Sequence, residues 1–261
     1  MNTDAVFALT LKDMREAFSS AEIYAPMLGI PLFFAFVLPL FTVYVSQYAG
    51  LQLAERILGP VALGQAPPLD KLAFVRYFAL NVLGPIFLSM PIITASVLAA
   101  DSFAGEKERK TSESLLASPI SNSELFLGKI LASALPALAV TLAVFGIYAG
   151  VIDYFTLGEY GALVLPNGEW YMMLANSPFL ILSTIGLVVV VSSKVKGIKE
   201  AQQISALLAL PIFLMPFIAV FNVFSFSALF FAYLLLFLAA LTLAILAFGV
   251  KSFRREGLVA E

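Results

Sequence analysis

The stretch that decides the fold is residues 204–250, ISALLALPIFLMPFIAVFNVFSFSALFFAYLLLFLAALTLAILAFGV, which contains no charged residue. A transmembrane helix needs about 20 mostly apolar residues, because each residue rises about 1.5 Å and the hydrocarbon core is about 30 Å thick. The stretch is therefore long enough for two crossings. We predict a helical hairpin whose turn lies at Asn222–Ser227.

The composition of the whole chain has the same character. Of the 261 residues, 61% are hydrophobic and 12% are charged, against about 45–50% and about 25% in an average soluble domain. Too few polar side chains remain to cover a soluble globule. Six crossings are predicted in one transmembrane domain of residues 1–261, an all-α membrane protein: Tyr24–Tyr48, Tyr77–Ala100, Ile130–Ile152, Leu174–Val191, Ile204–Phe224 and Ala228–Val250.

The basic residues predict the orientation. With six crossings, the side that holds both termini and the second and fourth loops carries twelve Lys and Arg, and the other side carries three. Because Lys and Arg are enriched in cytoplasmic loops, we expect a multi-pass protein of the plasma membrane with both termini in the cytoplasm. Asp4 stands where a signal peptide has basic residues, so we expect the first span to direct insertion. An interfacial aromatic belt is expected at the outer ends of the spans, from Tyr44, Tyr48, Tyr77, Tyr148, Tyr154, Trp170 and Tyr171.

Two segments outside the spans have helical patterns. Residues 4–20 alternate apolar and charged side chains with helical spacing, which predicts an amphipathic helix at the cytoplasmic surface of the membrane. Asp101–Pro119 is the most charged part of the chain, and Glu106–Lys110 and Arg109–Glu113 are spaced for pairing along a short helix. Ser121 and Glu124 then form a capping-box pattern at the start of the third span. On physical grounds alone, the charged segment could also be a solvated loop that only sets the topology.

The run from Ala100 to Lys129, ADSFAGEKERKTSESLLASPISNSELFLGK, resembles the signature of ABC-2 type permeases. These are membrane subunits of one class of ATP-binding-cassette transporters. The Gly-Glu-Lys-Glu sequence at 105–108, the sequence Leu-Leu-Ala-Ser-Pro-Ile-Ser at 115–121 and Gly128-Lys129 stand in the order found in the family, and residues 192–203 and 208–212 also fit. The chain departs from the family in its very short connection between the last two spans.

The resemblance implies specific partners and contacts. In the family, the loop after the second span forms a coupling helix that docks on a separate nucleotide-binding subunit. Here that coupling segment would be residues 101–121, with Gly105, Glu106, Lys107, Glu108, Arg109, Lys110, Thr111 and Glu113 as the docking residues. A secondary cytoplasmic contact would involve Lys194, Lys196, Lys199 and Glu200. Two ATPase subunits, a second permease chain in a homo- or heterodimer, and outward transport are implied as well.

The sequence also argues against several chemistries in this chain. Ser stands at position 123, five residues before Gly128, and Ile130 follows Lys129. A phosphate-binding loop needs Gly at the first of these positions and Ser or Thr at the second. We therefore expect no ATPase site and no cofactor here, with ATP and Mg²⁺ bound by the partner subunit. The absence of His and Cys removes their metal-binding, disulfide and nucleophile–base chemistry, and a net charge of −2 gives no indication of nucleic-acid binding.

Two other functional classes compete with an ABC permease. An ion-coupled secondary transporter usually carries an ionisable residue near the middle of a span, whereas Asp101, Lys129 and Asp153 stand at predicted span ends. An intramembrane enzyme would need a nucleophile and a base, and no such pair is found. We predict the transport subunit of an ABC exporter, with a secondary transporter as the alternative and an apolar or amphipathic cargo weakly preferred.

Overall fold

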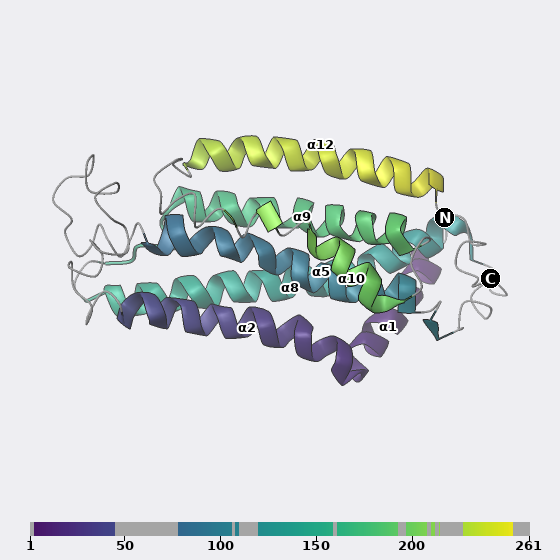
Figure 1. Cartoon of the computed structure of the whole chain (residues 1–261), viewed down its shortest axis with the longest axis horizontal. Helices are drawn as coiled ribbons and strands as arrows, with labels where there is room; N and C mark the ends of the chain where they lie inside the picture. Colours follow the sequence, from purple (N-terminus) through teal and green to yellow (C-terminus); the bar gives the residue numbers. More distant parts are fainter. Residues whose placement is uncertain are drawn as a thin grey trace.

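The computed structural model shows a bundle of long helices lying side by side (Figure 1). It describes residues 3–44, 78–105, 108–109, 120–158, 161–192, 197–207, 210–211, 214 and 227–252. The main elements are α1 (Thr3–Ser19), α2 (Ala21–Tyr44), α5 (Ser89–Ala100), α8 (Asn122–Thr156), α9 (Gly168–Ser192), α10 (Ile198–Ala206) and α12 (Ala228–Ser252). These ranges contain helices and no strand, which confirms the predicted all-α class for the described part of the chain.

Five helical stretches in the described residues are long and apolar enough to cross a membrane. They are Ala21–Tyr44, Phe78–Gly105, Ser123–Thr156, Gly168–Ser192 and Ala228–Ile245, and their mean hydropathies lie between 2.0 and 2.6. They coincide with five of the six predicted spans, which is the pattern of a multi-pass membrane protein. The other predicted span, Ile204–Phe224, lies mostly outside the described residues, and its first residue belongs to α10.

The second predicted span is the centre of the bundle. In the most apolar part of Phe78–Gly105, 89% of the residues are buried, whereas in Ala228–Ile245 17% are buried. Accordingly, α12 and α2 form opposite edges in Figure 1, and α5, α8 and α9 lie between them. Large apolar side chains on the two edge helices are exposed, among them Phe33, Phe36, Phe41, Leu229, Tyr233, Leu236, Phe237 and Leu243. Since a membrane helix can expose such side chains to lipid, these faces fit a bilayer environment.

The central span is a composite helix. A π-helical turn η2 (Phe78–Leu83) and a 3-10 turn η3 (Gly84–Leu88) precede α5, and a second π-helical turn η4 (Asp101–Gly105) follows it. Pro85 and Pro91 have no backbone N–H, so a regular α-helical bonding pattern is interrupted at both residues. The Tyr148 hydroxyl of α8 donates to the Ala79 carbonyl at 2.8 Å, which satisfies one polar group of this irregular region inside the bundle.

A buried aromatic cluster joins three of the spans. The rings of Phe87, Phe145, Tyr148 and Trp170 have centroids 4.3–5.9 Å apart, and all four side chains are at most 2% exposed. The sequence pattern placed Tyr148 and Trp170 in the interfacial belt, and this prediction is wrong because both rings belong to the core. By contrast, Tyr44, Tyr154 and Tyr171 are exposed, as side chains of such a belt must be.

The longest helix, α8, begins and ends with polar contacts. The predicted capping box is confirmed, because the Glu124 N–H donates to Ser121 Oγ and the Ser121 N–H donates to Glu124 Oε2. At the other end, the Asp153 carboxylate accepts hydrogen bonds from three consecutive backbone N–H groups, of residues 163, 164 and 165, at 2.7–2.9 Å. The chain after α8 is thereby folded back, and α9 begins at Gly168, six residues before the predicted start of the fourth span.

Candidate functional site

The N-terminal helix α1 packs directly on the first turns of α8. Its buried face consists of Val6, Leu9, Thr10, Asp13 and Ala17, a spacing that lines up along one side of a helix. The contact is close at Gly128, because a Cβ atom there would lie 2.7 Å from Cδ2 of Leu9. The Thr10 hydroxyl lies 3.2 Å from the Gly128 carbonyl oxygen. The predicted amphipathic helix therefore exists and is docked on the bundle along one face.

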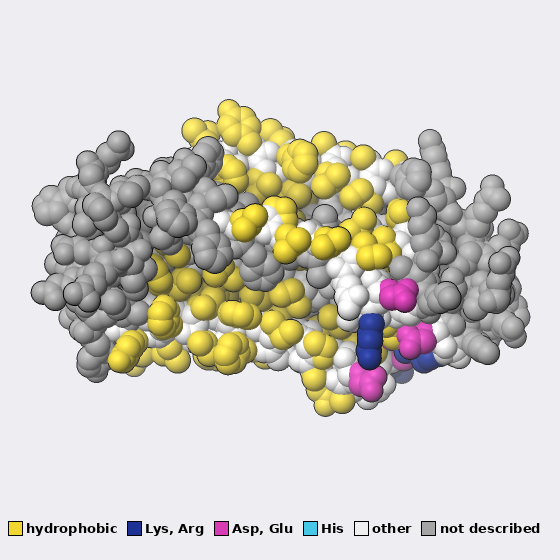
Figure 2. Space-filling model, viewed as in Figure 1, with side chains coloured by type: hydrophobic (Ala, Val, Ile, Leu, Met, Phe, Trp, Pro, Cys, Tyr) yellow, Lys and Arg dark blue, Asp and Glu magenta, His cyan; other side chains and the backbone are white. Residues whose placement is uncertain are grey.

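A second face of α1 is apolar and exposed. Phe7 is 63% exposed, and Leu11 and Phe18 also lie on the surface. Figure 2 shows that the visible acidic and basic side chains gather at the end of the molecule that carries α1, whereas the sides of the bundle are hydrophobic. We call this end the α1 end. The first turn of α8, the last turn of α9 and the last turn of α12 lie there as well (Figure 1).

Lys129 is buried at the α1 end. Its ammonium has no solvent exposure, lies 3.7 Å from Asp13 Oδ2 and donates to the Ser102 carbonyl. It also lies 5.4 Å from the centre of the Phe103 ring. The Ser102 hydroxyl donates to the same Asp13 carboxylate at 3.1 Å. An isolated buried ammonium would be strongly unfavourable, so these contacts explain how a lysine is accommodated where α1, η4 and α8 meet.

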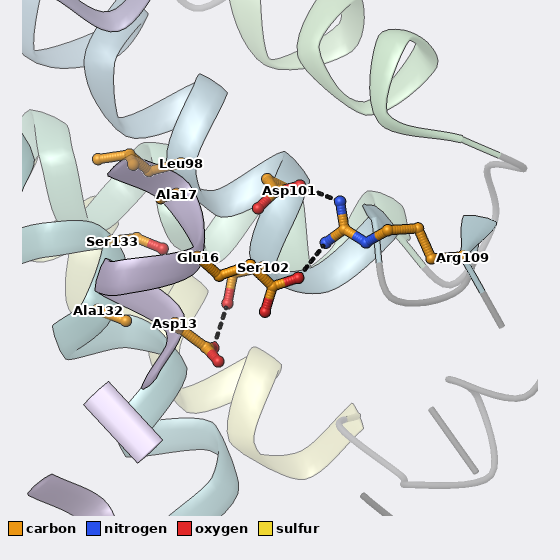
Figure 3. Close-up of a pocket in the computed structure, with 9 residues that line it drawn as sticks. All are labelled: Asp13, Glu16, Ala17, Leu98, Asp101, Ser102, Arg109, Ala132 and Ser133. Atoms are coloured by element: carbon orange, nitrogen blue, oxygen red, sulfur yellow. Dashed lines mark hydrogen bonds and ion pairs between the residues drawn. The ribbon is translucent and has the colours of Figure 1, made fainter. Parts of the chain in front are cut away.

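Arg109 of the coupling segment is held by two carboxylates (Figure 3). Its Nη1 lies 2.8 Å from Asp101 Oδ1, and its Nη2 lies 3.2 Å from Glu16 Oε1. Asp101 belongs to η4, which is the first turn of the coupling segment and continues the central span, and Glu16 belongs to α1, so one guanidinium joins residue 109 to both elements. A small cavity of about 10 Å³ lies beside these groups, with Ser102 and Ser133 also in its wall. It has room for about one water molecule.

Gly105 allows the Arg109–Asp101 pair to form. A Cβ atom on Gly105 would lie 2.8 Å from Asp101 Oδ1 and 3.0 Å from Arg109 Nη2. The backbone N–H of Arg109 donates to the Gly105 carbonyl at 2.9 Å, so the chain turns here with helical spacing. The sequence pattern predicted a partner for Arg109 at Glu113, but the structure shows Asp101 and Glu16 as partners, and Glu113 lies outside the described residues.

Glu108, the neighbour of Arg109, points to another element. Its Oε2 accepts a hydrogen bond from the backbone N–H of Ile198 at 3.0 Å, at the first residue of α10. Lys199 and Glu200, two residues of the predicted secondary contact, are exposed in the first turn of this helix. The structure thus brings together two regions that the resemblance named separately. No sequence signal indicated the Glu108–Ile198 contact or the Asp13–Lys129 pair.

The remaining predicted docking residues lie outside the described part of the chain. They are Glu106, Lys107, Lys110 and Thr111 in the coupling segment, together with Glu113, and Lys194 and Lys196 before α10. Their proposed contacts with a partner stay predictions.

Comparison with known proteins establishes the family. Residues 7–234 match the family described as ABC-2 family transporter protein, so the chain belongs to that family. One curated relative is the ABC transporter permease protein NatB of Bacillus subtilis (strain 168), which is 32% identical over 146 residues. That match covers 53% of this chain and 37% of the length of NatB. The family inferred from residues 100–129 is confirmed.

Proposed function

We propose that this chain is the transmembrane permease subunit of an ABC exporter, driven by ATP hydrolysis on a separate nucleotide-binding subunit. Family membership supports the general class. The observation that carries the coupling mechanism is the pair of carboxylates that hold Arg109, because they join the coupling segment to α1 and to the end of the central span. A movement of the segment would thereby reach the part of the bundle that is most buried.

The proposed coupling has a physical basis in the charges of the α1 end. Asp13 and Lys129 are buried, and Asp13 lines the same small cavity as Glu16 and Asp101, the carboxylates that bind Arg109. Separating such groups leaves a charge without its partner in a region of low dielectric constant, which is costly. The cluster is therefore expected to move as a unit when the partner subunits close on ATP, so that α1 and the second and third spans shift together.

ATP and Mg²⁺ would bind to the partner subunits, of which we propose two copies, and a second permease chain would complete a homo- or heterodimer. The position of Gly128-Lys129 supports this assignment. Gly128 lies against Leu9 of α1, and the Lys129 ammonium is engaged by Asp13. Neither residue is arranged as in a loop whose backbone N–H groups bind phosphate.

We propose further that the α1 end faces the cytoplasm of a cell whose plasma membrane holds the protein, with both termini on that side. The exposed apolar faces of α2 and α12 support a place in the membrane, and the basic residues of the predicted loops support this orientation. The last turn of α9 lies at the α1 end and the first turn of α12 lies at the opposite end (Figure 1), as a further crossing between them would require.

The test is to purify the tagged chain from its native membrane and identify any ATPase that stays bound. The reconstituted complex is then assayed for ATP hydrolysis with a panel of apolar and amphipathic compounds. We expect stimulated hydrolysis by the complex and no saturable ATP binding by this chain alone. ATP binding by the isolated chain, or transport driven by an ion gradient in vesicles that lack any ATPase, would contradict the proposal.

A further inference from the structure

The start of α10 is capped by a residue from another loop. The first backbone N–H groups of a helix have no partner within the helix, and a Ser, Thr, Asp or Asn just before it usually provides one. Gly197 occupies that position here and has no side chain. The Glu108 carboxylate takes this place, with Oε2 accepting from the Ile198 N–H at 3.0 Å. A carboxylate is also favoured there by the helix dipole.

The neighbouring residues Glu108 and Arg109 bind different elements. Arg109 binds Glu16 of α1 and Asp101 of η4, whereas Glu108 binds α10. In turn, α10 packs against α5 and α9, with Ala201 completely buried. The last three residues of α10 are also the first three of the predicted span Ile204–Phe224. These two consecutive residues therefore connect the coupling segment with α1, with the end of the central span and with α10.

We propose that Glu108 is a positioning residue that transmits movement of the coupling segment to α10. This inference rests on the proposed function, because it assigns a second path for the same coupling step. The Glu108–Ile198 bond is exposed to solvent. Exposed bonds of this kind contribute little to stability, so the bond can form and break during a transport cycle. Its role is to make the position of α10 depend on that of the coupling segment.

The test separates transmission from simple capping. The full complex with its ATPase is reconstituted, and the amount of cargo moved per ATP hydrolysed is measured for each variant. We expect Glu108→Ala to lower this ratio about fivefold or more, which is the lower range of ordinary coupling between sites. Glu108→Gln should keep most of it, because the amide oxygen can still accept the bond from Ile198. Gln203→Ala, an exposed change on α10, serves as the matched control.

The decisive variant is Glu108→Ala combined with Gly197→Ser. A serine at position 197 supplies a cap from the residue directly before α10. Its side chain has room, because alanine at position 108 lacks the carboxylate that lies beside residue 197. If Glu108 transmits movement, the double variant stays uncoupled although α10 is capped. If Gly197→Ser restores the ratio, or if Glu108→Ala never lowers it, the inference is wrong.

Failure of this inference can be distinguished from failure of the proposed function. If the wild-type chain binds no ATPase, or moves no cargo when ATP is hydrolysed, the proposed function itself fails, and with it the inference about Glu108. If the wild-type complex transports and Glu108→Ala transports with the same ratio, only the role of Glu108 is excluded.

Discussion

The buried Lys129 ammonium lies 3.7 Å from the Asp13 carboxylate and so ties the third predicted span to the N-terminal helix. Asp13 is itself almost fully buried and also accepts a hydrogen bond from Ser102. Asp13 also lies 3.3 Å from the exposed Lys12 ammonium. The Lys129 ammonium is removed from water, so the Asp13 carboxylate is needed to compensate its charge. This pair makes α1 an integral part of the bundle, although α1 also has an exposed apolar face.

The first prediction concerns this pair. Asp13→Asn leaves the Lys129 charge buried without its carboxylate, so we expect a loss of about 3 kcal/mol in the free energy of unfolding. Asp13→Asn combined with Lys129→Met should recover much of that loss, because no buried charge is left unpaired. Thermal unfolding in detergent measures the stability of both purified variants. Lys12→Met removes an exposed partner and should change stability little. A fully stable Asp13→Asn variant would contradict the proposed role of the pair.

The second prediction concerns the close contact between α1 and α8. Gly128→Leu forces a side chain against Leu9, whose Cδ2 would lie 2.7 Å from the new Cβ atom. We expect a loss of about 1–3 kcal/mol, typical of overpacking, and partial recovery when Leu9→Ala is added. A cysteine at the buried Val6 position should react faster with a water-soluble maleimide in Gly128→Leu than in the parent protein.

Two glycines of the same helix provide the control for this experiment. At Gly146 and Gly150, no atom beyond the chain neighbours and the adjacent backbone of the helix lies within 4 Å of the position that a Cβ atom would take. Alanine there meets no steric obstacle and has the better helix propensity. Gly146→Ala and Gly150→Ala should leave the labelling rate at position 6 unchanged. Equal labelling of Gly128→Leu and these controls would show that α1 does not depend on the contact at Gly128.

The third prediction concerns Arg109. Arg109→Ala removes the connection between the coupling segment and the two carboxylates, so stimulation of ATP hydrolysis by cargo should be lost in the reconstituted complex. Arg109→Lys should show a stimulation between those of wild type and Arg109→Ala. An ammonium lacks the planar guanidinium by which Arg109 reaches Asp101 and Glu16 together. Arg15→Ala removes an exposed basic residue from α1 and should behave as wild type. Wild-type stimulation in Arg109→Ala would return the segment to the interpretation of a solvated loop.

The fourth prediction concerns the orientation. The chain has no cysteine, so single cysteines can be introduced without background labelling. Gly158→Cys, just after α8, should react with a membrane-impermeant maleimide on intact cells. Ser112→Cys, in the coupling segment, should react only after the membrane is permeabilised. The reverse labelling pattern would overturn the proposed orientation.

The sequence by itself determined most of the long helices and the start of α8, but it did not predict α10 as a separate helix. Apolar length identified five spans that the structure contains, and the Ser121–Glu124 pattern located the start of α8. Residues 100–129 were sufficient to identify the family, which the match over residues 7–234 confirms. These features are local, because apolar length and helix caps depend on residues that are close together in the chain.

Only the tertiary structure decided which polar groups meet. The partners of Asp13, Arg109 and Glu108 come from other elements, and helical periodicity contains no information about such distant pairs. In the same way, Tyr148 and Trp170 are of the residue types found in an interfacial belt. They lie in the core instead, because their rings pack with Phe87 and Phe145. Whether a side chain faces lipid, water or a neighbouring helix is set by how the helices pack, and that packing fixes the charged cluster of the α1 end.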